Sequence, residues 1–231
     1  MRMFQIQNNT HMKTKKTAFS RSRKVLSFLC VGGLMLIGLT EAFGQYSLAQ
    51  LQSDPIHLPV PVLQQSRGTS CGEAVIAMTY NYAYPNTPLA EQQVIEYAAA
   101  NGYFTEDLPP FTSPANMVKI AKNYTEAVSA GTVLSASQGL TLLQEKLRNG
   151  EPVMIDVLSN FTDPESEAHF VVITGISVDT ARDNVVVIYY NDPLKGTAEA
   201  ADWDGSQGLW NAWRTNGDPG GAGWWMVISP P

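Results

Sequence analysis

The spacing of the apolar residues changes at Gly150, and this change constrains the fold more than any other feature of the sequence. Before Gly150 the apolar residues recur at intervals of three and four, as on one face of an α-helix. After Gly150 they follow the two-residue period of a β-strand. A chain that forms helices first and strands second around one core has an α+β fold. We therefore predict an N-terminal helical part, with a central helix, packed on a C-terminal antiparallel sheet.

Individual helices and strands are predicted from residues that favour their ends. Ser and Thr-Pro or Ser-Pro pairs favour helix starts, and glycine favours helix ends. The predicted helices cover residues 71–82, 88–100, 114–123 and 138–149. Strands rich in Val, Ile, Tyr and Trp are predicted at 152–158, 169–177, 185–190 and 224–229, with a hairpin turn at 179–184 and a short helix in the loop 203–222.

The first residues of the chain differ from the rest in charge. Seven of the fifteen Lys and Arg lie within residues 1–24, and an uncharged apolar run follows over residues 25–40. A basic segment, a short apolar run and then small residues are typical of a secretory signal. We therefore expect residues 1–49 to be a signal peptide, cleaved after Gly44 or Ala49, and residues 50–231 to be an exported domain, secreted or periplasmic. The run is shorter than the roughly 20 residues of a spanning helix, which disfavours an uncleaved anchor.

The exported domain is acidic and poor in metal ligands. From residue 50 onward there are eight basic and twenty acidic side chains, a formal charge of −12. Such a surface repels phosphate, so no nucleic-acid partner is predicted. One cysteine and two histidines at unrelated spacings do not make a tetrahedral zinc site, and no phosphate-binding glycine loop is present. We expect neither a metal nor a cofactor, and no membrane association after signal removal.

Cys71 is the only cysteine of the exported domain, since Cys30 lies in the apolar signal run. A solitary exported thiol cannot form an internal disulfide, so it is either buried and inert or kept for its reactivity. Ser70 and Glu73 are predicted to form a capping box that makes Cys71 the first helical residue. The positive end of a helix dipole favours a thiolate there. Gly72 is expected to leave room for a substrate backbone.

A base and an orienting acid can also be predicted. His169 opens a strand that follows an acidic loop, whereas His57 lies in a Pro-rich linker and is expected to be solvated. In an antiparallel hairpin the end of the second strand lies beside the start of the first. Asp192 is therefore expected near His169, as the third group of a nucleophile, base and orienter arrangement. A different register would direct Asn191 there instead.

These segments together resemble the peptidase C39-like family, papain-like cysteine peptidases related to the processing domains of bacteriocin exporters. The resemblance is carried by residues 65–74 (Gln-Ser-Arg-Gly-Thr-Ser-Cys-Gly-Glu-Ala), 169–175 (His-Phe-Val-Val-Ile-Thr-Gly) and 191–193 (Asn-Asp-Pro), and it covers roughly residues 58–231. It implies a papain-like fold with Cys71 as nucleophile, His169 as general base and Asp192 as orienting acid. Gln65 matches the glutamine that donates to the oxyanion, with Gln64 as the alternative. Ser70 stands where the exporter peptidases usually carry an acid.

The resemblance implies a secreted peptidase that hydrolyses peptide bonds in a peptide or protein substrate through a thioester. Two alternatives use the same fold. One is a papain-like amidase or γ-glutamyl transferase, because peptide scission and peptide transfer share the same three groups. The other is a binding module without turnover, in which the C-terminal tryptophans form a ligand surface.

Overall fold

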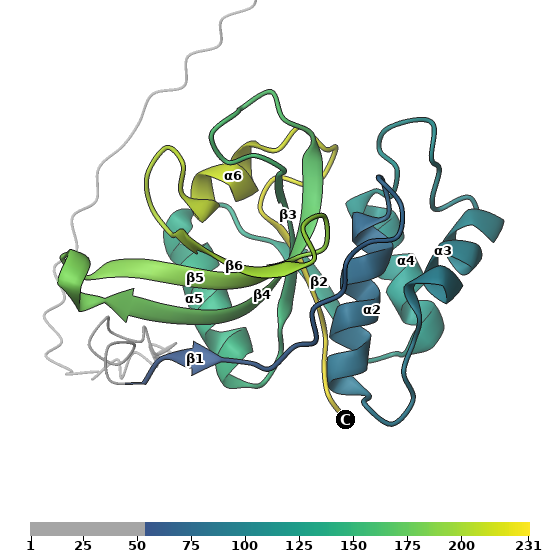
Figure 1. Ribbon diagram of the computed structural model, residues 1–231, viewed down its shortest axis with the longest axis horizontal. Helices are drawn as coiled ribbons and strands as arrows, with labels where there is room; N and C mark the ends of the chain where they lie inside the picture. The colour runs from purple at the N-terminus through teal and green to yellow at the C-terminus, as the bar shows by residue number, and fades with distance from the viewer. Residues whose placement is uncertain (1–53) are drawn as a thin grey trace, which may run out of the picture. The chain divides into compact units, whose positions relative to one another are not determined.

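The computed structural model describes residues 54–231 (Figure 1). In these residues helices combine with an antiparallel sheet, so the α+β prediction is confirmed. The predicted signal peptide, with both of its cleavage positions, lies outside the described residues. Over residues 54–231, no helix combines the length and the apolar character that a membrane span requires.

The helices agree closely with the sequence prediction, with one exception. They are α2 (Cys71–Ala83), α3 (Glu91–Ala100), α4 (Pro114–Tyr124), α5 (Ala136–Arg148) and α6 (Leu209–Thr215). The exception is α3, which begins three residues after the predicted start at Pro88. The Asn81 side chain accepts from the Leu89 N–H at 2.6 Å and donates to the Leu89 carbonyl at 3.1 Å. These two bonds use the N–H and the carbonyl of Leu89, so this residue lies outside the helix. The Gln93 side chain then accepts from the Ala90 N–H at 3.0 Å and caps the start of the helix.

The sheet contains three strands that the sequence did not indicate. Its strands are β1 (Ile56–His57), β2 (Val128–Thr132), β3 (Val153–Leu158), β4 (Ala168–Asp179), β5 (Val185–Asp192), β6 (Thr197–Asp202) and β7 (Trp224–Ile228). Their order is β2-β7-β3-β4-β5-β6, with β1 paired to β4, and all pairs are antiparallel. The unpredicted strands are β1, β2 and β6. Strand β2 contains Ser, Ala and Gly, and β6 consists mainly of Ala and acidic residues, all of which have low strand propensity. Pairing with a neighbouring strand, rather than propensity, therefore makes both segments strands.

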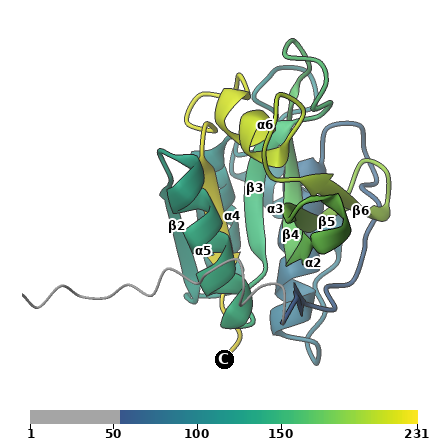
Figure 2. The ribbon, with the colours of Figure 1, turned by 90° about the vertical axis from the view of Figure 1, so that its left-hand side faces the viewer.

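Helices cover both faces of the sheet, an arrangement that the sequence prediction did not specify (Figures 1 and 2). One core lies between the sheet and α2, α3 and α4; the other lies beneath α5 and α6. Adjacent residues of β3 divide between them, because Met154 belongs to the first core and Ile155 to the second.

Helix α2 is the central element of the first core, as expected. Its residues from Gly72 to Thr79 are all buried, including Ala74 and Ala77, whose small side chains allow close approach of the neighbouring elements. Burial on several sides fixes the position of the helix, and with it the position of its first residue, Cys71.

Candidate active site

Cys71 is half-buried at the first position of α2, but the predicted capping box does not form. The Ser70 hydroxyl makes no capping bond and instead donates to Glu91 Oε1 at 2.6 Å. Glu73 is also engaged elsewhere, since its Oε1 accepts from the Thr112 hydroxyl at 2.7 Å. The prediction was wrong because a charged acceptor from another helix competes successfully with a local backbone N–H for the serine hydroxyl.

Glu91, at the start of α3, holds the segment that leads into Cys71. Both of its carboxylate oxygens lie 3.0 Å from the Ser66 backbone nitrogen, and Oε1 also accepts from Ser70. The side chain is buried, so these bonds are shielded from water. A carboxylate from α3 therefore lies next to Ser70, the residue that stands where the exporter peptidases usually carry an acid.

The structure brings His169 and Asp192 together. His169 near the start of β4 is buried, and its Nε2 lies 2.8 Å from Asp192 Oδ1 at the end of β5. The Cys71 thiol lies close enough to the same imidazole to raise its pKa. Because Asp192 occupies Nε2, the thiol is left with the other ring nitrogen, Nδ1. The alternative orienter, Asn191, is directed elsewhere and donates to the Val60 carbonyl at 3.1 Å.

The electrostatics of these groups favour a charged imidazole. Burial alone would lower the pKa of His169, but the hydrogen bonds and charges of Asp192 and Cys71 outweigh it and raise the pKa to about 9. Burial raises the pKa of Asp192, but its hydrogen bond to His169 and the charge of His169 lower it by more, so its net shift is downward. At neutral pH the site therefore holds an imidazolium between a carboxylate and a thiol, the state that stabilises a thiolate.

Of the two candidate glutamines, Gln65 is the one joined to the segment after β5. Its backbone N–H donates to the Pro193 carbonyl at 2.8 Å, which ties it to the residue that follows Asp192. Its side-chain Nε2 donates to the Arg67 carbonyl at 2.7 Å. An amide nitrogen carries two N–H groups, so one remains for a further acceptor. Gln64 is exposed, and its side chain packs against the Gly196 turn.

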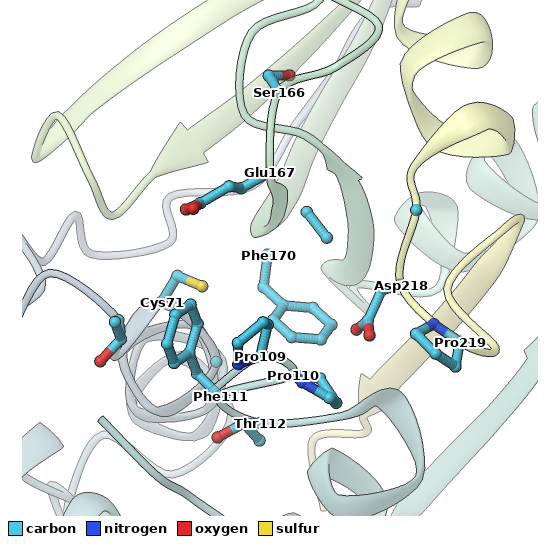
Figure 3. Close-up of a pocket in the computed structure, with 14 residues that line it drawn as sticks. Cys71, Pro109, Pro110, Phe111, Thr112, Ser166, Glu167, Phe170, Asp218 and Pro219 are labelled. Atoms are coloured by element: carbon cyan, nitrogen blue, oxygen red, sulfur yellow. The ribbon is translucent and has the colours of Figure 1, made fainter. Parts of the chain in front are cut away.

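A cavity of about 420 Å³ lies beside Cys71. Its walls are largely apolar and are formed by Pro109, Pro110, Phe111, Phe170 and Pro219. Figure 3 shows the Cys71 sulfur on one side of this cavity and the Asp218 carboxylate on the other. The size and the apolar lining are those of a typical ligand pocket.

Gly72 lines the cavity, but the space beside it is mostly occupied by protein. A Cβ at this position would lie 2.8 Å from the Met117 sulfur and 3.5 Å from the Phe170 ring. The glycine therefore allows α4 to approach α2, a role in packing that the sequence did not indicate.

Sequence reasoning missed two acids near the site, Asp156 on β3 and Asp218 in the loop before β7. Asp156 is fully buried, and neither of its carboxyl oxygens has an ordinary hydrogen-bond partner among residues 54–231. Burial and the neighbouring Asp218 carboxylate raise the pKa of Asp156 to about 8, against the opposing charge of His169. Burial also raises the pKa of Asp218. A signal was present in the sequence, because Asp156 interrupts the otherwise apolar segment 153–158.

The second histidine of the described residues lies apart from these groups. His57 is exposed on β1, pairs with Gly175 and meets the edge of the Tyr189 ring at 5.7 Å between centroids. It is in a strand rather than in the predicted linker. Within residues 54–231, no group of three His, Cys, Asp or Glu side chains is arranged to hold a metal ion.

Comparison with known protein families gives a match that covers most of the chain. The model of the peptidase C39-like family matches residues 57–219, more than two thirds of the chain. The matched range includes Gln65, Cys71, His169 and Asp192 and ends one residue beyond Asp218. No curated protein sequence matches the chain.

Proposed function

Because the chain belongs to the peptidase C39-like family, we propose that it is a papain-like cysteine peptidase in which Cys71, His169 and Asp192 hydrolyse peptide bonds. The observation that carries the proposal is a buried imidazole that is hydrogen-bonded to a carboxylate and has a thiol close enough to raise its pKa, at the edge of a cavity. This arrangement of nucleophile, base and orienting group is the one that acyl transfer requires.

The proposed cycle has two halves. The Cys71 thiolate attacks the peptide carbonyl, and the oxyanion accepts from the Cys71 backbone N–H and from the free N–H of the Gln65 amide. Each such donor is worth about 3 kcal/mol in comparable sites. The His169 imidazolium then gives its proton to the leaving amine, leaving a thioester. In the second half His169 takes a proton from water, which attacks the thioester and releases the carboxylic acid and the thiolate.

A peptide-library digest tests the proposed function. Wild type and Cys71→Ala are incubated with a mixture of peptides, and the products are identified by mass spectrometry. We expect new amino and carboxyl termini with wild type and none with the variant, because the alanine carries no nucleophile. Products joined through a new amide would indicate transfer instead of hydrolysis. An intact library with wild type would contradict the proposal and favour a binding module.

The pH dependence of hydrolysis tests the role of Asp192. In wild type we expect kcat/KM to fall as the pH rises through about 9, where His169 loses the proton that it gives to the leaving amine. In Asp192→Asn the negative charge is lost, and burial, which lowers the pKa of His169, is opposed less strongly. The alkaline limb should therefore move to lower pH in the variant. A limb that stays in place would show that Asp192 does not act on the imidazole.

We also propose that the protein is exported by way of residues 1–49 and meets a peptide or protein substrate outside the cytoplasm. The basic and apolar character of residues 1–40 supports this proposal. Amino-terminal sequencing of the mature protein would test it, with a terminus after Gly44 or Ala49 as the expected result.

A further inference from the structure

The cavity beside Cys71 is negatively charged. Among the described residues that line it, two are acidic, Glu167 and Asp218, and none is basic. Glu167 is exposed, whereas Asp218 is half-buried. Asp218 also takes part in no ion pair within residues 54–231. An unpaired, half-buried carboxylate on an apolar wall is an unusual arrangement, because it gives up solvation without gaining a partner.

A second carboxyl group lies behind Asp218. Asp156 is directly opposite Phe170 in the pairing of β3 with β4, so the two side chains project from the same face of the sheet. Phe170 lines the cavity, and Asp156 is therefore on the face that the cavity occupies. A Cβ at Gly221 would overlap a carboxyl oxygen of Asp156, so the loop 216–223 lies directly over it.

The two carboxyl groups interact, and Asp156 is the one whose neutral form is favoured. Asp156 is the more deeply buried of the two, and burial and the neighbouring Asp218 carboxylate raise its pKa, so its neutral form is favoured. The loop is also fixed by Asn216, whose amide donates to the Asp156 carbonyl at 2.9 Å and whose side-chain oxygen accepts from the Asp218 N–H at 3.2 Å. Asp218 is thereby kept as a positioned acceptor, with its negative charge directed at the cavity (Figure 3).

The walls and the acid select complementary parts of one side chain. Pro109, Pro110 and Phe170 line the cavity, on the wall between the Cys71 sulfur and Asp218 (Figure 3). An aliphatic stem packs well on such walls, and a terminal cation would meet the carboxylate in partly desolvated surroundings, where the attraction is stronger than in water. Lysine and arginine have both parts.

We propose that this cavity is a specificity subsite that binds a lysine or arginine side chain of the substrate, with Asp218 as the residue that recognises the charge. The inference rests on the proposed function, since it names the substrate class of the same site. It assigns Asp156 a positioning role, because that residue acts only through Asp218.

The test uses matched synthetic peptides with acetylated amino termini, so that no terminal amine competes for the carboxylate. Lysine, norleucine or glutamate is placed in turn at each of several positions around the cleaved bond; norleucine keeps the stem and lacks the charge. At the position that occupies the cavity, we expect wild type to prefer lysine over norleucine by about tenfold to a hundredfold in kcat/KM, the range for a charge-assisted hydrogen bond. Glutamate should be the poorest substrate there, and arginine should exceed citrulline in the same way.

Three variants test which acidic residue causes the preference for lysine. In Asp218→Asn the preference for lysine over norleucine should fall to near unity, while norleucine peptides are still cleaved. Asp204→Asn, at an exposed position that does not line the cavity, should keep the wild-type preference. Glu167→Gln should keep most of it, because an exposed carboxylate interacts weakly with a cation.

The outcomes distinguish the inference from the function on which it rests. If wild type cleaves none of the peptides, the proposed function fails and the inference fails with it. If peptides are cleaved but lysine, norleucine and glutamate are equivalent at every position, or if Asp218→Asn keeps the preference, the subsite is refuted and the peptidase stands. The wild-type comparison needs no variant, so it decides the matter even where Asp218→Asn does not fold.

Discussion

His169→Ala is expected to reduce kcat/KM for peptide hydrolysis by a factor on the order of 10⁶, the effect of removing the base from comparable nucleophile and base pairs. The physical reason is that one ring serves both halves of the proposed cycle. In that cycle the neighbouring imidazolium offsets the charge of the attacking Cys71 sulfur, and the ring carries the proton to the leaving amine and back from water. Within residues 54–231, Asp192 and Cys71 are the titratable side chains that raise the pKa of His169. We therefore expect the three residues to act as one unit.

Non-additivity provides the sharper form of this experiment. If thiol and imidazole act together, Cys71→Ala and His169→Ala should each reduce the rate about equally, and the double variant should be no slower than either single variant. His57→Ala is the matched control, because His57 is exposed on β1 and should leave the rate unchanged. Multiplicative losses in the double variant would show that the two residues act independently and would remove the basis for the proposed mechanism.

Asp156→Asn is expected to stabilise the folded protein, by a few kcal/mol at pH 8. Asp156 is fully buried on β3, and burial raises its pKa from 3.8 to about 8. Asparagine has nearly the same shape as the protonated acid, but it carries no charge at any pH. For a domain of this size the gain corresponds to an increase in Tm of roughly 5 to 15 °C.

The pH dependence identifies the cause of this stabilisation. Between about pH 4 and pH 8 the native Asp156 holds a proton that the unfolded chain has released, so the stability of wild type falls by about 1.4 kcal/mol for each pH unit in this window. The advantage of Asp156→Asn should therefore be near zero at pH 4, grow up to about pH 8 and remain constant above it. Glu73, whose pKa burial raises to about 7, adds a similar slope to both proteins and cancels in the difference.

Thermal unfolding of the two proteins across this range of pH provides the measurement. Asp204→Asn is the control, because Asp204 is exposed and its replacement should change Tm little at any pH. A destabilised Asp156→Asn, or a gain that does not vary with pH, would mean that the buried carboxyl is ionised and paired in the native state. A buried acid that lowers stability is consistent with retention for function rather than for folding.

The sequence by itself determined the order of elements and the residues with the reactive chemistry. The sequence placed α2, α4 and α5 to within a few residues, because α4 and α5 have an apolar stripe, α2 contains a continuous apolar run, and each has a recognisable end, such as Ser113 before Pro114. It also predicted the β4 and β5 hairpin, and antiparallel geometry then brought Asp192 to within 2.8 Å of His169. These predictions depend on local pattern and on one short turn, and both can be read along the chain.

Only the tertiary structure decided the long-range polar contacts. Ser70 and Glu73 have the spacing of a capping box, yet Glu91 and Thr112 take their hydrogen bonds from other elements. Asp156 and Asp218 are far apart in sequence and meet only because the loop before β7 folds over β3. The physical reason is that a hydrogen bond or a charge interaction depends on distances of a few ångströms between segments, and packing of the whole domain sets those distances. Local sequence specifies which groups are available, and the fold specifies which of them meet.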